Sequence, residues 1–233
     1  MQKDIAKRLA SRKRKEIKRE DVSPSAVLLL LLEKDEQYHV VFTRRSDSVE
    51  HHKGEISFPG GTVHRDDSDL LATALREGAE EIGLAPGDVT ILGALDDILT
   101  VSTGFVITPY VGIIPYPYPF QINADEVAEL ILVPLRGLMD ERCVGASEVT
   151  WDGKEITTYH FHYQGDIIWG ATARILKEFC SFFHCHLLEG FFFFDIPNSS
   201  RGKSSLFFLD LVTIRFLPEL KVCVFTSFCQ GLF

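Results

Sequence analysis

Arg-Glu-Gly-Ala-Glu-Glu-Ile-Gly, residues 76–83, closes a segment that begins near Asp69 and has the periodicity of an amphipathic helix. Successive residues of an α-helix are about 100° apart, so its acidic and apolar residues fall on separate sides. The acidic side holds Glu77, Glu80 and Glu81, and the apolar side holds Leu71, Leu75 and Ile82. The last glycine suits the position after a helix C-terminus. We predict a helix over about 69–82 with three acids on one exposed side.

The three glutamates are close enough to repel one another, because Glu77 is followed by acids three and four positions later. Like charges at this spacing destabilise a helix by about 0.2–0.5 kcal/mol per pair. A hard divalent cation such as Mg²⁺ or Mn²⁺, which favours oxygen ligands, would reverse the effect. The alternative interpretation is a solvated acidic face.

Features around the helix favour the metal site. The turn Gly60-Gly61 precedes the helix, so a backbone carbonyl can reach a cation; Arg76 adjoins Glu77 and can orient it; and Asp66-Asp67 adds acid in the loop. A cation held there can neutralise a diphosphate, polarise the phosphorus and lower the pKa of a bound water. The predicted chemistry is therefore hydrolysis of a phosphoanhydride.

The sequence resembles the Nudix hydrolases, whose signature is Gly-x5-Glu-x7-Arg-Glu-x-x-Glu-Glu-x-Gly followed by an apolar residue. Every fixed position of the second half matches, from Arg76 to Gly83. In the first half, fourteen residues instead of thirteen separate Gly61 from Arg76, and the glutamate position falls at Ser68 or Asp67. We interpret Asp67 as the shortened acid.

An upstream motif is similar to the branch of the family that cleaves coenzyme A. That branch carries Leu-Leu-Thr-x-Arg-Ser-x3-Arg-x3-Gly-x3-Phe-Pro-Gly-Gly, and residues 41–61 follow it at the same spacing. One position differs: Glu50 replaces the second arginine and reverses the charge where a substrate phosphate would dock. Residues 125–135 and 168–174 also resemble the branch, so the resemblance covers roughly residues 23–179.

The resemblance implies an α/β (α+β) fold, a Nudix-type αβα sandwich around a mixed β-sheet, with Mg²⁺ or Mn²⁺ as cofactor. The implied metal ligands are Glu77, Glu81, Glu80 and the Gly61 carbonyl. Substrate contacts are expected from Arg45, Gly60 and Gly61, the arginine binding a phosphate through its planar guanidinium. The general base is Glu77 positioned by Arg76, or, as a second choice, Glu126 or Glu129.

For coenzyme A, the implied products are adenosine 3′,5′-bisphosphate and phosphopantetheine. Glu50 favours an alternative substrate, such as ADP-ribose or a dinucleotide. From a different class, the chain could be a binding module that kept the fold and lost the chemistry. The complete set from Arg76 to Glu81 argues against this, since a binder has no need of three repelling carboxylates.

Patterns elsewhere predict the remaining elements. A hairpin is expected from residues 26–32 and 39–43, further strands from 89–95, 105–114, 130–133 and 156–163, and a closing helix from 168 to about 179. Pro115, Pro117 and Pro119 make a stiff loop that cannot be a central strand. Helices and strands in this order indicate helices packed on a mixed sheet.

Charge and cysteine usage limit the partners. Residues 1–21 hold nine Lys and Arg against four Asp and Glu, whereas the whole chain has a net charge of −9, so the body is acidic. An acidic body argues against a nucleic-acid groove and leaves a small nucleoside diphosphate derivative as the expected partner. No run is long enough to span a membrane. Five cysteines without metal spacing predict the cytoplasm or another reducing compartment; an oligomer stays open.

The two ends differ in composition from the body. Residues 1–22 are predicted as a basic helix or arm, which could contact a partner or a surface or be simply solvated, and 23–179 as the Nudix domain. Thirteen of the eighteen phenylalanines and four of the five cysteines lie in the last 55 residues. Residues 180–233 are therefore predicted to be an atypical, poorly ordered tail, with a small packed extension or membrane contact as alternatives.

Overall fold

The computed structural model describes residues 1–49, 52–100, 103–151 and 153–190. These residues belong to one compact unit, Met1–Phe193. Glu50 and residues 191–233 of the predicted tail (180–233) lie outside the described residues, so the predictions made for them stay predictions.

The expected hairpin is confirmed as β1 (Ser23–Lys34) and β2 (Gln37–Arg45). Lys34 pairs with Gln37, which leaves Asp35 and Glu36 as a two-residue turn. Both turn residues have positive φ angles, 50° and 59°. This is the backbone of a type I′ turn, whose twist matches that of the flanking strands. The local turn therefore sets the register of the long central strand β1.

The main sheet is mixed, with the strand order β3-β2-β1-β7-β5. In addition, β4 pairs with β1, β6 with β7 and β8 with β2. Strands β1 and β7 run parallel, and the other pairs in this sheet are antiparallel. The bounds are β3 (Ile56–Ser57), β4 (Gly60–Thr62), β5 (Thr90–Ala94), β6 (Ile98–Leu99), β7 (Phe105–Ile113) and β8 (Val127–Pro134).

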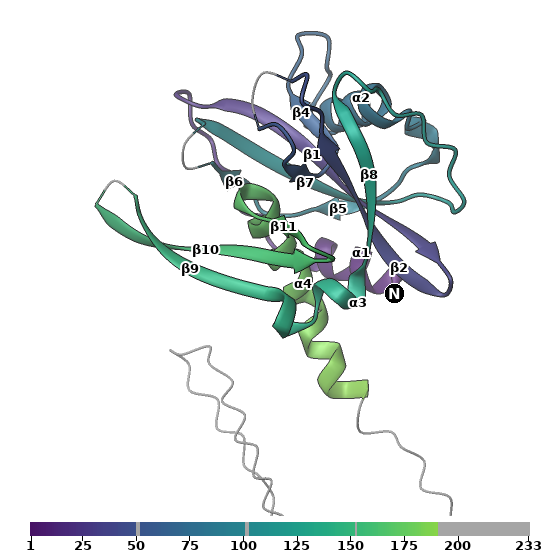
Figure 1. The fold of residues 1–233 in the computed structure, drawn as a ribbon, viewed down its shortest axis with the longest axis vertical. Helices are drawn as coiled ribbons and strands as arrows, with labels where there is room; N and C mark the ends of the chain where they lie inside the picture. Colours follow the sequence, from purple (N-terminus) through teal and green to yellow (C-terminus); the bar gives the residue numbers. More distant parts are fainter. Residues whose placement is uncertain (50–51, 101–102, 152, 191–233) are drawn as a thin grey trace, which may run out of the picture. The chain divides into compact units, whose positions relative to one another are not determined.

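Helices cover both faces of this sheet (Figure 1). Alternate side chains of a strand point to opposite faces. Accordingly, Leu28, Leu30 and Leu32 of β1 pack in the cluster that contains α2 (Leu70–Ile82). Leu29 and Leu31 pack in the cluster that contains α1 (Gln2–Ser11) and α4 (Gly170–Gly190). The predicted αβα sandwich around a mixed sheet is confirmed.

A second, three-stranded sheet has the order β11-β10-β9. Its strands are β9 (Val144–Trp151), β10 (Lys154–Tyr163) and β11 (Asp166–Ile168). Short helical turns are α3 (Leu135–Leu138), η1 (Pro86–Asp88) and η2 (Glu141–Cys143). The sequence predicts β10 but misses β9. Residues 146–150 of β9 are all exposed, so they carry no buried face that would give an alternating apolar pattern.

The N-terminal helix packs on the domain instead of standing apart from it. Ile5 and Leu9 of α1 are 3% and 7% exposed and belong to the same core cluster as α4. The extended chain that follows is tied down by Arg12, which pairs with Asp96 and Glu178. Part of the positive charge of the N-terminal segment is therefore neutralised by acidic residues of the domain.

The C-terminal helix continues past Phe179, where the sequence analysis placed the domain boundary. Cys180 and Phe183 are buried in the same cluster as α1, at 2% and 9% exposure. The core therefore extends at least four residues beyond the predicted boundary. No helix within the described ranges has the length and apolar character needed to cross a membrane.

Candidate active site

Local signals fix both ends of α2. The Asp69 side chain accepts a hydrogen bond from the Ala72 N–H at the N-terminus, as N-cap residues do. Gly83 ends the helix with a φ of 69°. Gly78 lets the helix approach the sheet, since a Cβ there would lie 3.0 Å from Cδ1 of Leu28. The helix therefore lies tightly over β1, beside the glycines of β4.

The three glutamates of α2 differ in exposure, which corrects the expectation that they share one exposed side. Glu80 keeps 52% of its side-chain surface exposed and Glu77 keeps 15%. Glu81 is only 4% exposed. Because each step along the helix turns the side chain by about 100°, the face that packs on β1 and β4 takes Glu81 inward and leaves Glu80 in solvent.

The glycine turn of β4 touches both inner glutamates. The Gly60 N–H donates to Oε2 of Glu81 over 3.3 Å. The Glu77 carboxylate lies directly against Gly61, where an added Cβ would be 2.5 Å from Cδ of Glu77. Gly60 has a φ of 149°, a conformation that side chains rarely adopt. The two glycines thus have different roles: Gly60 provides the bend, and Gly61 leaves room for the Glu77 carboxylate.

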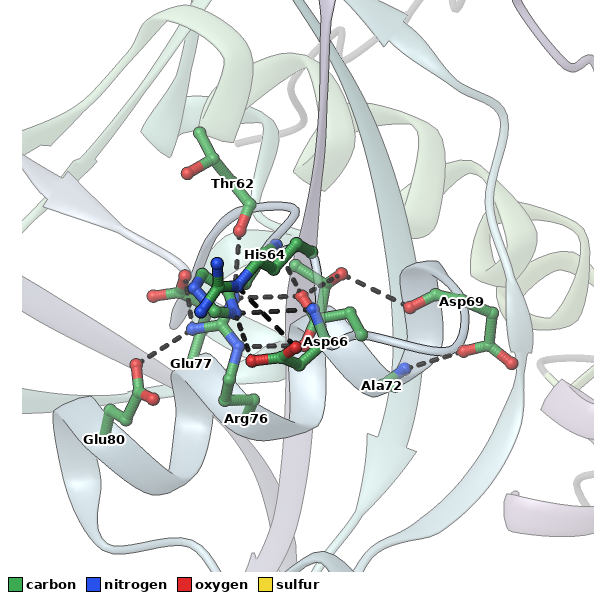
Figure 2. A network of polar contacts seen from close by, with 11 residues as sticks. Thr62, His64, Asp66, Asp69, Ala72, Arg76, Glu77 and Glu80 are labelled. Carbon is green, nitrogen blue, oxygen red and sulfur yellow. Dashed lines mark hydrogen bonds and ion pairs between the residues drawn. The ribbon is translucent and has the colours of Figure 1, made fainter.

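Arg76 is the hub of a polar network beside these glycines (Figure 2). Its Nε and one terminal nitrogen donate to the two oxygens of Asp67 over 2.9 and 3.1 Å. It also donates to the Thr62 carbonyl and contacts the carboxylates of Glu77 and Glu80, each at 2.9 Å. The paired guanidinium holds the pKa of Asp67 well below its usual range. Arg76 therefore joins the loop, β4 and the glutamates into one unit.

The inner glutamates retain protons more readily than ordinary carboxyl groups. Burial raises the pKa of Glu81 to about 8; Glu77 and Glu126 add to the rise, whereas the Gly60 N–H and Arg45 oppose it. Burial also raises the pKa of Glu77, although Arg76 opposes the shift. A divalent cation would offset both the burial and the mutual repulsion, and carboxylate oxygens are ligands that Mg²⁺ and Mn²⁺ accept. The donor set fits such an ion.

The acids do not form a ready-made cage. Within the described part of the chain, no group of three acidic, histidine or cysteine side chains is arranged to hold a metal ion. The same nitrogen of Arg76 contacts both Glu77 and Glu80. Arg76 therefore holds Glu77 and Glu80 equally closely, and what distinguishes Glu77 and Glu81 is that both carboxylates lie against the glycine turn.

The two loop acids named from the sequence, Glu126 and Glu129, differ in their electrostatic surroundings. The charge of Glu126 helps to raise the pKa of both Glu77 and Glu81. Glu129 instead forms an ion pair with Arg44, 3.1 Å away, and the same arginine also pairs with Asp166 of β11. The two acids therefore have different charge partners.

Residues 22–138, about half of the chain, match the NUDIX domain family. The chain belongs to the Nudix family. It is 36% identical over 139 residues to a protein of Yersinia pestis named uncharacterized Nudix hydrolase NudL, over 60% of this chain and 69% of the relative. A protein of the same name from Yersinia pseudotuberculosis matches to the same extent.

Solved Nudix structures are similar over part of the chain. The NUDIX domain of Shewanella oneidensis NrtR, in complex with ADP ribose, is 21% identical with a TM-score of 0.41, over 56% of this chain and 79% of that one. An Ap4A hydrolase of C. elegans is 16% identical with a TM-score of 0.42, over 49% and 82% of the two chains.

Two parts of this Nudix site were missed by the sequence analysis. The Thr62 carbonyl accepts from Arg76 over 2.9 Å, and a backbone contact of this kind leaves no signal in the sequence. The Asn123 side chain donates to Oε1 of Glu126 over 3.2 Å. Asn123 could have been found, because asparagine side chains commonly close turns by bonding the backbone two residues further on.

Proposed function

We propose that this Nudix chain is a metal-dependent pyrophosphohydrolase that cleaves the phosphoanhydride of a nucleoside diphosphate derivative, with coenzyme A as the first candidate substrate. The observation that carries the proposal is the placement of Glu77 and Glu81, two carboxylates with raised pKa, against the bend at Gly60 and Gly61. Arg76 pairs with Glu77, yet burial still raises the pKa of both acids, and a bound divalent cation would offset that cost of burial.

Glu77 and Glu81 would hold the cation, with Glu80 and the Gly61 carbonyl as further ligands once Glu80 leaves Arg76. When bound, the ion supplies charge neutralisation for the diphosphate and a water of lowered pKa. Arg76 keeps Glu77 in place through their 2.9 Å contact. Arg45, whose charge lowers the pKa of Glu81, supplies a cation for the substrate phosphate.

For the general base, the contacts favour Glu126 over Glu77. The Glu77 carboxylate is engaged by Arg76 and packed against Gly61, which suits a ligand better than a group that must accept a proton. The Glu126 carboxylate is held by a neutral amide, and among the residues that the structure describes it forms no ion pair that would compete for the proton.

The coenzyme A assignment is supported by the upstream motif, whose strands β2 and β3 lead into β4, the strand that contacts the catalytic helix. The Phe42 ring stacks on Phe58 at 5.0 Å, and Thr43 makes a 3.3 Å hydrogen bond with Ser57. These contacts join the strand that carries Arg45 to the segment that leads into Gly60. Glu50 favours the alternative substrates, ADP-ribose or a dinucleotide, because it replaces a cation of the motif.

The test is to incubate the full chain with Mg²⁺ and, separately, coenzyme A, ADP-ribose and dinucleotides, and to identify the products by mass. Formation of adenosine 3′,5′-bisphosphate from coenzyme A is the expected result. Cleavage of the other compounds but not of coenzyme A would select the alternative substrates. The variant Glu81→Gln is the control: hydrolysis should fall by orders of magnitude, whereas a binding module would bind nucleotide without turnover in either form.

A further inference from the structure

The loop before β8 is fixed to the end of α2 that carries Glu81. The Gln121 N–H donates to the Ile82 carbonyl over 3.0 Å, and the Asn123 N–H donates to the Glu81 carbonyl over 2.9 Å. Carbonyls in the last turn of a helix lack hydrogen-bond donors within the helix, so the loop supplies the donors that the Ile82 and Glu81 carbonyls need. The loop therefore has a defined position relative to the catalytic helix.

From this anchor, Asn123 folds the next residues into a tight turn. Its carbonyl accepts from the N–H groups of Glu126 and Val127 over 3.1 and 2.9 Å. Its Oδ1 accepts from the Asp125 N–H over 3.2 Å, and its Nδ2 donates to Oε1 of Glu126, also over 3.2 Å. If the amide were flipped, its Nδ2 would face the Asp125 N–H, donor against donor, and its Oδ1 would face the Glu126 carboxylate, acceptor against acceptor. These two partners therefore determine the orientation of the amide.

An amide suits this position better than the other polar groups. A carboxylate there could not donate to Glu126 and would repel it, and a hydroxyl is too short to serve both partners. A cationic side chain would donate but would also pair the charge, as Arg44 does with Glu129 at 3.1 Å. Asn123 thus orients the carboxylate and leaves its charge available.

We infer that Asn123 is a positioning residue, which holds the Glu126 carboxylate toward the Glu77 and Glu81 pair so that Glu126 can accept the proton of the attacking water. The inference rests on the proposed hydrolase function. Asn123 acts by placing Glu126 relative to α2 and does not itself contact the substrate.

The experiment compares Asn123→Ala and Asn123→Asp with the matched changes Gln121→Ala and Gln121→Glu at an exposed amide of the same loop. Both Asn123 variants should lower kcat about tenfold, a part of the 10²–10⁴-fold effect of a general base, and leave KM within about twofold. Mn²⁺ affinity of Asn123→Ala, measured by calorimetry, should stay within about twofold. The Gln121 variants should keep wild-type kcat.

A double-mutant cycle separates positioning from a structural effect. If Asn123 acts through Glu126, adding Asn123→Ala to Glu126→Gln should change kcat by less than about twofold, because the positioned group is already gone. A further tenfold loss in that background, or wild-type kcat in both single variants, would overturn the inference. Asn123→Asp, which retains the oxygen that accepts from Asp125, carries the test if the alanine variant does not fold. A wild-type chain that hydrolyses no compound of the panel would instead refute the proposed function.

Discussion

Replacing Gly61 by alanine tests the contact on which the proposed metal site depends. The new Cβ would lie 2.5 Å from Cδ of Glu77 and 2.6 Å from each of its oxygens, whereas ordinary contacts begin at 3.4 Å. The carboxylate must therefore retreat by about 1 Å, a displacement that can lower a rate about 10²-fold. This corresponds to about 2.7 kcal/mol of transition-state stabilisation. The group that must move is the end of a flexible side chain, so the fold should stay intact.

The assay measures kcat/KM for the substrate that the product analysis selects, Mn²⁺ affinity by calorimetry, and the melting temperature. Gly61→Ala should lose about 10²-fold in kcat/KM and should bind Mn²⁺ more weakly, with a melting temperature within a few degrees of wild type. Gly87→Ala is the matched control, because no atom lies within 4 Å of a Cβ built there. A Gly61→Ala protein with kcat/KM within threefold of wild type would refute the reasoning that Glu77 must occupy this space.

Three further predictions follow from burial and charge. In metal-free protein, the pKa of Glu81 is raised from 4.5 to about 8, so the folded state keeps a proton that the unfolded chain releases. Stability should then fall by a few kcal/mol as the pH rises from 5 to 8.5, as measured by urea unfolding in EDTA, and Glu81→Gln should reduce the slope to the part that other buried acids such as Glu77 contribute. Adding Mn²⁺ at about 100 times its Kd should stabilise the wild type by about 2.7 kcal/mol at pH 8, a gain that Glu81→Gln should lack in thermal melts. Ile5→Ala should lower the free energy of unfolding by about 2–5 kcal/mol because Ile5 of α1 is part of the core, whereas Lys13→Ala at an exposed site should change it by less than about 0.5 kcal/mol.

Features determined by neighbouring residues could be predicted from the sequence. Helix α2 follows from its periodicity and from the residues at its ends, Asp69 and Gly83, and the structure has it at Leu70–Ile82. The β1–β2 hairpin follows from two apolar runs around a short polar turn. These signals are local, because capping groups, turn angles and side-chain periodicity depend on a few adjacent residues.

Features that depend on contacts between distant segments could not be predicted. Periodicity placed Glu77, Glu80 and Glu81 on one side of a helix, but only the packing of α2 on the sheet buries Glu81 and leaves Glu80 exposed. Similarly, Glu126 and Glu129 are equivalent in the sequence until Arg44, 85 positions before Glu129, pairs with one of them.

The sequence by itself determined which residues are candidates for the proposed chemistry and which local elements carry them. The tertiary structure decided which of those residues meet, because the burial of a carboxyl group and the partner of a charge depend on the chain that folds over it. The N-terminal segment shows the same division: its basic composition favours solvent or a partner, yet Ile5 and Leu9 lie in the core because a hydrophobic surface on the sheet is there to receive them.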